Sequence, residues 1–280
     1  MSDYLFNEFD EVSSKEWKQK IQVDLKGADY NETLLWKNLE GIDVKPFYHQ
    51  DEFNNDFKVI PGTPEKWNIA QLIFIDNETI ANQLILDSVN RGAEAVILSA
   101  DKEFNIEKVF NNFIFEKSSI YFNLTFLSES FITNLLAFFS NKNGTVFYNI
   151  DLIGNLARTG NWFTNLKDDH ILLDKVIEQN PHENILSVDG TLFQNSGANI
   201  TQQLAYCLAQ ANEYLNHFKE SNNKQLKLTF KLSVGSNYFF EIAKIRALRR
   251  LYALLANEYG SFPECNILTV PSNRNKTIYD

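Results

Sequence analysis

Two carboxylates and a histidine stand side by side at Asp168, Asp169 and His170 and form a candidate site for chemistry. Such a group could transfer protons or help to hold a metal ion. Carboxylates are also frequent where a helix begins, because they accept from its free N–H groups and face its positive end. The second interpretation is favoured, so we expect Asp168 or Asp169 to cap the following helix.

Other sequence patterns that would indicate a catalytic or metal site are missing. No GxGxxG, GxxxxGK[ST], GxSxG or HExxH pattern occurs, which argues against a dinucleotide fold, a phosphate loop, a serine hydrolase elbow and a zincin helix. The two cysteines lack CxxC spacing and indicate reduced, buried thiols. We therefore predict no metal site. The scattered residues are His49, His170, His182, His217, Cys207 and Cys265.

Three arginines lie close together in the last long helical pattern. Arg246, Arg249 and Arg250 are spaced i, i+3 and i+4 and could contact another subunit or a CoA phosphate. Charge clusters on helices usually face water, so a solvated helix face is the favoured interpretation.

Charge and hydropathy exclude several classes of partner. The formal net charge of −10 disfavours nucleic acid and anionic lipid as partners. The N-terminus, MSDYLFNEFDEV, is acidic and unlike a signal peptide, and no apolar run approaches the roughly 18–20 residues that span a bilayer. A cytoplasmic protein that binds neither nucleic acid nor membrane is expected.

The elements that would position a site begin after residue 62. Residues 1–62 predict an N-terminal arm, with a short helix capped by Ser13 or Ser14, a turn at Gly41 and a closing Pro-Gly-Thr-Pro loop. From there to residue 280, β-rich runs alternate with helical patterns, which predicts right-handed βαβ units and a parallel sheet. The seven runs are 71–75, 94–99, 119–124, 145–150, 184–190, 226–233 and 266–270; helical patterns include 77–91, 128–141 and 199–218.

Periodicity alone fits either a doubly wound sheet or most of an eight-stranded barrel. Three segments choose between them: 24–48 (DLKGADYNETLLWKNLEGIDVKPFY), 150–163 (IDLIGNLARTGNWF), and a set running from 186 through VGSNYFFEIAKIRALRRLYA to 280. Together they resemble the methylmalonyl-CoA mutase family in its small-subunit form. The segment Asn237–Ala247 is the most specific match.

This resemblance implies a TIM-type (β/α)8 barrel whose axis threads a CoA ester. With seven strand-like runs, the barrel over 63–280 is expected to be incomplete, lacking an eighth strand. The arm over 1–62 is expected to wrap a partner subunit. In the last long helix we expect one face to be buried, made of Phe239, Ile242, Ile245, Leu248, Tyr252 and Leu255.

The end of the fifth run departs from the catalytic pattern. Where catalytic members of the family resemble Gly-Tyr-His-Met-Gln-Glu-Ala-Gly-Ala, this chain reads GTLFQNSGA over 190–198. The substrate-side tyrosine therefore falls on Thr191, and the histidine that donates to the thioester carbonyl falls on Leu192. Leucine has no donor, and losing a preorganised donor of this kind costs on the order of a hundredfold in rate.

The resemblance thus implies a non-catalytic small subunit, in a heterodimer with a large (alpha) subunit that interconverts methylmalonyl-CoA and succinyl-CoA. Adenosylcobalamin is expected in that partner, with no cofactor bound by this chain. One alternative is an acyl-CoA-binding or isomerising barrel that uses Asp189, Gln194 and Asn195 instead. Another is a stand-alone interaction module.

Overall fold

The structure is a computed structural model that describes residues 8–53, 59–220 and 225–277. The chain divides into two compact units, Met1–Val59 and Ile60–Asp280. Each unit is considered by itself.

The first unit is a small arrangement of short elements. Helix α1 (Ser14–Asp24) begins at a capping box in which Ser13 and Glu16 satisfy each other's backbone N–H groups. Helix α2 (Tyr30–Leu34) follows, and β1 (Trp36–Lys37) pairs antiparallel with β2 (Asp43–Val44) before a 3-10 turn, η1 (Gln50–Glu52). Tyr30 is the only buried residue among those described in this unit, so the arm has almost no core of its own.

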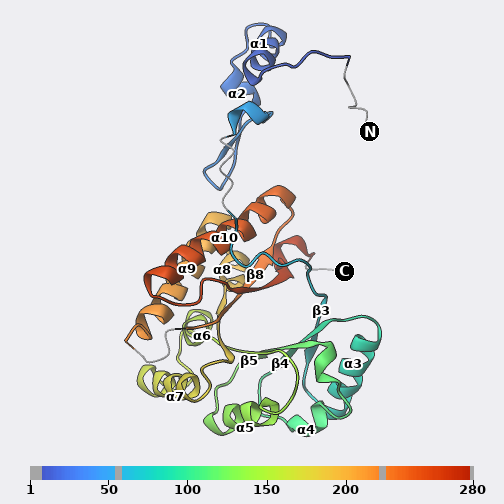
Figure 1. The fold of residues 1–280 in the computed structure, drawn as a ribbon, viewed down its shortest axis with the longest axis vertical. Coiled ribbons are helices and arrows are strands. Elements are labelled where there is room, and N and C mark those ends of the chain that lie inside the picture. The colour runs from blue at the N-terminus through green and yellow to red at the C-terminus, as the bar shows by residue number, and fades with distance from the viewer. Residues whose placement is uncertain (1–7, 54–58, 221–224, 278–280) are drawn as a thin grey trace. The chain divides into compact units, whose positions relative to one another are not determined.

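The second unit is an α/β fold whose seven parallel strands curl into an open barrel (Figure 1). Neighbours in the sequence are neighbours in the sheet, which is the strand order of a barrel and not of a doubly wound sheet. All seven predicted strands are confirmed, and with them the TIM-type architecture. The strands are β3 (Ala70–Phe74), β4 (Ala95–Ala100), β5 (Ser119–Leu124), β6 (Val146–Ile150), β7 (Asn184–Asp189), β8 (Leu228–Val234) and β9 (Asn266–Pro271).

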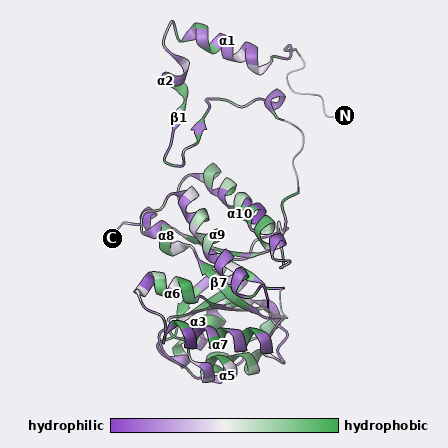
Figure 2. Ribbon diagram, turned by 90° about the vertical axis from the view of Figure 1, so that its left-hand side faces the viewer, coloured by the Kyte–Doolittle hydropathy of each residue, from purple (hydrophilic) through white to green (hydrophobic). Residues whose placement is uncertain are grey.

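Helices cover the outer face of this sheet (Figures 1 and 2). The helical patterns that begin at Asn77, Ser128 and Asn199 are confirmed, and each of these three residues is the N-cap of its helix. The helices are α3 (Glu78–Asn90), α4 (Ile106–Val109), α5 (Glu129–Phe139), α6 (Leu152–Thr159), α7 (Leu166–Gln179), α8 (Thr191–Asn195), α9 (Ile200–His217) and α10 (Tyr238–Glu258), with 3-10 turns η2 (Phe115–Lys117) and η3 (Asn273–Asn275).

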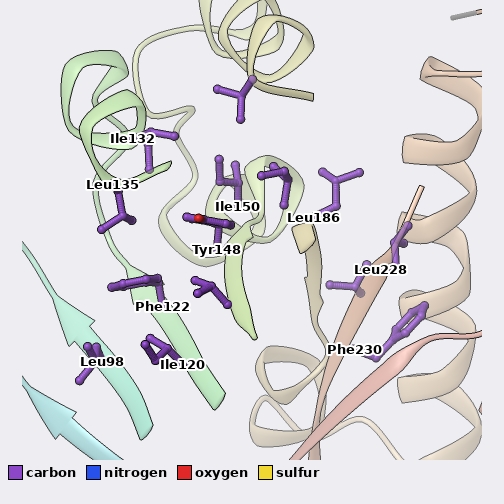
Figure 3. Packing of buried hydrophobic residues seen from close by; sticks show 14 of the residues in the cluster. Leu98, Ile120, Phe122, Ile132, Leu135, Tyr148, Ile150, Leu186, Leu228 and Phe230 are labelled. Atoms are coloured by element: carbon purple, nitrogen blue, oxygen red, sulfur yellow. The ribbon is translucent and has the colours of Figure 1, made fainter. Parts of the chain in front are cut away.

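The main core lies between the sheet and these helices, because alternate strand residues point to opposite faces. Figure 3 shows Ile132 and Leu135 of α5 facing Phe122 and Tyr148 of the strands below them. A smaller cluster fills the inner face of the sheet, and its members are Ala95, Ile97, Tyr121, Phe147 and Leu268. The rings of Tyr121 and Phe147 stack there with centroids 4.3 Å apart.

The face of helix α10 that was predicted to be buried is confirmed only in part. Leu248 and Tyr252 are fully buried as expected, but Phe239 is 78% exposed and Ile242 is also exposed. Phe239 precedes Leu248 by nine residues, about two and a half turns of helix, which puts it on the opposite side. Lys244 is buried on the core side in place of these apolar residues.

The curled sheet is open on one side. Within the part of the chain that the structure describes, β3 pairs only with β4 and β9 pairs only with β8. Among the same residues, no helix is both long and apolar enough to span a bilayer.

Candidate functional site

Polar residues meet on the inner face of the sheet where β7 and β8 end. Ser187 lies in register with Thr229, and Asp189 with Lys231. Because side chains alternate along a strand, these four share one face while Leu186, Val188 and Leu228 join the core on the other. The C-terminal ends of barrel strands are where this architecture places its functional residues.

Asp189 is the centre of this polar group. Its Oδ2 lies 2.8 Å from Nη2 of Arg158, which α6 supplies, and 3.5 Å from Nζ of Lys231 on β8. Asp189 is buried, Lys231 is half-buried and Arg158 is exposed. One carboxylate therefore balances two cations that come from different elements.

Thr191 holds the other oxygen of the same carboxylate. Its backbone N–H donates to Oδ1 of Asp189 over 3.1 Å, and its hydroxyl donates to that oxygen as well. Thr191 is itself buried. The residue that stands where the family pattern has a tyrosine thus orients a neighbouring carboxylate.

A second carboxylate, that of Asp151, contacts the backbone of Asp189. It caps α6 by accepting from the N–H of Gly154 over 2.8 Å, and the same oxygen accepts from the hydroxyl of Tyr214 over 2.9 Å and from Gln210. Its Oδ2 accepts from the backbone N–H of Asp189 over 2.9 Å. Burial, together with a smaller contribution from the charge of Asp189, raises the pKa of Asp151 to about 6 in spite of these hydrogen bonds.

A bulge precedes Asp151 on β6. The register with β7 shifts between Phe147 and Ile150, and Asn149 adopts a φ of 54°. Asparagine tolerates this left-handed conformation better than most residues. Its side-chain amide donates to the carbonyl of Phe122 over 3.1 Å, which joins β6 to β5 at the mouth of the site.

The cavity at this site is small. It encloses about 50 Å³, and its polar lining includes Asn149, Asp151, Arg158, Asp189 and Lys231. Pockets that enclose drug-sized ligands usually measure about 300–1,000 Å³. The chemistry available here is therefore charge pairing among the chain's own side chains, with room for a few water molecules.

A larger groove of about 740 Å³ lies along the open side of the sheet. Ala70 and Leu72 of β3 line it from one side and Leu268 of β9 from the other, while Lys231 and Arg249 contribute positive charge. Its volume falls within the range of ligand pockets.

Two of the residues considered for an alternative acyl-CoA site, Gln194 and Asn195, contact the loop after β9. Gln194 accepts from the hydroxyl of Ser272 over 2.8 Å, and Asn195 accepts from the backbone N–H of Asn273 over 3.2 Å. Both residues hold the loop after β9, and Asn195 also lines the larger groove together with Lys231. Leu192 is half-buried and has no polar atom on its side chain.

The Asp168–His170 group serves the start of a helix, as expected, but neither aspartate is the cap. Asn165 caps α7, and Asp168 lies in the first turn. Asp169 is buried and accepts from the N–H groups of Phe163 and Thr164 over 2.8 and 3.0 Å. The prediction missed Asn165 as the cap because the chain turns back before α7. In that turn the buried carboxylate of Asp169 accepts from backbone N–H groups of the preceding loop.

His170 is already occupied by local contacts. Its Nδ1 lies 2.7 Å from the carbonyl oxygen of Leu166, and its ring contacts Trp162 and His217. Among the described residues, no three histidine, cysteine or acidic side chains are grouped so as to hold a metal ion.

The arginine cluster divides between two environments. Arg246 and Arg250 are exposed, which agrees with the solvated helix face favoured from the sequence. Arg249 instead donates from Nη1 to the carbonyl of Cys265 over 3.2 Å. This hydrogen bond links α10 to the segment before β9.

Sequence reasoning missed Asp151, Arg158 and Lys231. One signal could have found Asp151, because it directly follows the predicted strand 145–150, in the position where barrel strands present functional groups. Nothing in the local pattern marks Arg158 or Lys231, since their pairing with Asp189 joins three elements far apart in sequence.

Comparison with known proteins identifies relatives across most of the chain. The sequence profile of a family described as methylmalonyl-CoA mutase matches residues 134–273, half of the chain. A methylmalonyl-CoA mutase small subunit from Porphyromonas gingivalis is 27% identical over 99% of this chain and 50% of its own length. Another, from Propionibacterium freudenreichii subsp. shermanii, is 20% identical over 91% of this chain and 46% of its own length.

A methylmalonyl-CoA mutase large subunit from Streptomyces virginiae also matches, with 36% identity over 28% of this chain and 11% of its own length. The chain thus spans about half the length of the small subunits from Porphyromonas gingivalis and Propionibacterium freudenreichii.

Proposed function

This chain belongs to the methylmalonyl-CoA mutase family, and from that premise we propose that it is a non-catalytic small subunit of an adenosylcobalamin-dependent mutase. Its partner would be the large subunit, which interconverts methylmalonyl-CoA and succinyl-CoA. The names of the relatives support a subunit role, since a small subunit implies a large one.

The N-terminal arm carries the proposal of a partner. Its described part, residues 8–53, buries only Tyr30 and exposes large apolar side chains such as Val23, Ile42 and Tyr48. Burial of such apolar side chains stabilises a protein. A unit with so little core of its own therefore gains stability mainly by folding against another chain. We propose that the arm wraps the large subunit.

The strand-end site supports a non-catalytic role. Thr191 and Leu192 replace the two residues that the family's catalytic pattern has there, and Thr191 is engaged with Asp189. The cavity beside them holds a set of charges already paired within the chain. A thioester carbonyl would meet no donor from Leu192.

We place no cobalamin on this chain. The spacing of Asp168 and His170 resembles the Asp-x-His-x-x-Gly box of cobalamin-binding domains, but Leu173 stands where that box has glycine. The proposal assigns adenosylcobalamin to the large subunit.

Coexpression with the large subunit of the same organism tests the subunit role. With a tag on the large subunit, the full chain should copurify in a fixed ratio. Val23→Asp in the arm should weaken copurification strongly, because it puts a charge on an exposed apolar position, whereas the neighbouring Gln22→Asp adds the same charge at a polar position. If wild-type chain stays in the flow-through, the subunit role fails.

Activity of the assembled complex tests the non-catalytic role. Leu192→Ala should change turnover of methylmalonyl-CoA by less than about twofold, since the side chain removed has no catalytic group. A loss of a hundredfold or more, of the size seen when a transition-state donor is removed, would assign this site to the reaction after all.

One observation favours an acyl-CoA-binding barrel as a second candidate. The 740 Å³ groove combines apolar residues of β3 and β9 with the cationic Lys231 and Arg249. A thermal shift of the purified chain with succinyl-CoA tests this, because ligand at about a hundred times Kd stabilises by about 2.7 kcal/mol. Free CoA serves as the control for the nucleotide moiety alone.

A further inference from the structure

Asp189 lies where two cations converge. Arg158 approaches from α6 and Lys231 from β8, and both reach the same oxygen, Oδ2, at 2.8 and 3.5 Å. A guanidinium and an ammonium that converge on one point bind a carboxylate there, whichever molecule provides it. Here the protein itself provides it.

We propose that Asp189 is a built-in counter-ion, which occupies an anion-binding position between Arg158 and Lys231 and excludes small carboxylate ligands from it. The inference goes beyond the subunit role proposed above and does not require a partner. It concerns one residue that determines which ligands the strand-end cavity admits.

Thr191 keeps Asp189 in this position. An aspartate that could rotate freely would release the cations part of the time. Both donors of Thr191 hold Oδ1, so that Oδ2 stays directed at Arg158 and Lys231. Thr191 is thus a positioning residue, and it is itself buried.

The anion position can be reached from solution. The side chain of Arg158 is 42% exposed, and the cavity of about 50 Å³ adjoins Asp189 directly. Removing the Asp189 carboxylate would enlarge this space and leave two positive charges facing the one remaining carboxylate, Asp151. A net positive, partly water-excluded position attracts anions more strongly than an exposed cation pair does.

The test compares wild type with Asp189→Ser, using malonate as the probe and uncharged malonamide as the control at matched ionic strength. Wild type should respond equally to both compounds in thermal denaturation. The variant should gain a saturable rise in Tm with malonate alone, of roughly 5 °C at about a hundred times Kd. Calorimetry should give one site per chain for the variant and no heat above dilution for wild type.

Two further variants assign the effect to this position. Arg158→Met on top of Asp189→Ser should abolish the response to malonate, because it removes one of the two cations and keeps an unbranched apolar stem in its place. Thr191→Val, which keeps the shape of threonine and loses its hydroxyl, should give a weaker malonate response than Asp189→Ser. A merely structural threonine would lower Tm without creating any response to malonate.

Several results would overturn the proposal. Equal malonate responses in wild type and Asp189→Ser would show that Asp189 excludes nothing, and no response in the variant would show that the cations form no anion site. If Asp189→Ser does not fold, Thr191→Val, which keeps Asp189 but releases its carboxylate, must still show a malonate-specific gain over wild type. Copurification with a large subunit is measured separately, so its failure leaves this result unaffected.

Discussion

The backbone N–H of Asp189 donates to Oδ2 of Asp151 over 2.9 Å, which joins the ends of β7 and β6 through a carboxylate that is also the cap of α6. The other oxygen of Asp151 accepts from Gly154, Gln210 and Tyr214. A single side chain therefore links two strands and two helices at the mouth of the barrel. Its protonation state should influence the stability of the whole strand-end region.

We expect stability to fall as pH rises through the titration of Asp151. Burial raises its pKa from 3.8 to about 6 in the folded chain, so between these values the folded chain binds more protons than the unfolded chain. This contributes a decrease of about 3 kcal/mol in the free energy of unfolding from about pH 4 to above pH 6. Urea unfolding at a series of pH values measures it.

Asp151→Asn is the matched control, because asparagine does not titrate. The difference between the two stability curves should change with pH in this interval, with wild type relatively more stable at the acid end. Parallel curves for wild type and variant would show that Asp151 keeps an ordinary pKa.

Gly190, between Asp189 and Thr191, should not tolerate a side chain. A Cβ there would lie 2.3 Å from Sγ of Cys207 and 3.2 Å from the carbonyl oxygen of Lys231. We expect Gly190→Ala to reduce the free energy of unfolding by about 1–3 kcal/mol through overpacking.

Adding Cys207→Ala should recover part of that loss, because it removes the closest atom. The double mutant should then be more stable than the sum of the single changes predicts, as two side chains competing for one space require. If the changes in the free energy of unfolding measured by chemical denaturation are simply additive, the strain lies instead at the backbone of β8.

Lys244 should be costly to replace singly. Its side chain is fully buried, and Nζ donates to the carbonyl of Ser233 and pairs with Glu241. Lys244→Met removes the donor to Ser233 and leaves the carboxylate of Glu241 without its cation, and should cost about 3–5 kcal/mol. In the double change with Glu241→Gln the cost should be clearly smaller, because the buried carboxylate is no longer left without its cation. Equal losses in the two variants would mean that Glu241 is solvated once Lys244 is gone.

The positions of strands and helices could be predicted because they depend on local patterns. Asn77, Ser128 and Asn199 mark helix starts through their own side chains, and the β-rich runs alternate with those helices at regular spacing. Even the incomplete barrel followed from the number of runs together with the family resemblance. These features need no knowledge of distant contacts.

The strand-end site could be predicted only in part. Asp189 was recognised from its place at a strand end, yet Arg158 and Lys231 reach it from positions 31 residues before and 42 residues after it in sequence. The phase of α10 failed for a related reason. An apolar stripe at helical spacing gives no measure of which face meets the sheet, so Phe239 was counted as core and Lys244 was not.

Both cysteine thiols should be unreactive in the folded chain. Burial raises the pKa of Cys207 to about 12 and that of Cys265 to about 12, and the thiolate is the reactive species. Labelling with Ellman's reagent at pH 8 should therefore be slow and should accelerate with denaturant in step with unfolding. Rapid labelling of one thiol in native buffer would reveal local opening around it.

Two residues of α10, the exposed Phe239 and the buried Leu248, should differ in how much they contribute to stability. Phe239→Ala should change the free energy of unfolding of the isolated chain by no more than about 0.5 kcal/mol, because the ring is 78% exposed. Leu248→Ala, on the buried side of the same helix, should cost about 2–5 kcal/mol. Chemical denaturation of both variants at one protein concentration checks the contrast. A large loss from Phe239→Ala in the isolated chain would mean that this ring is covered in solution, by a second copy or by the chain itself.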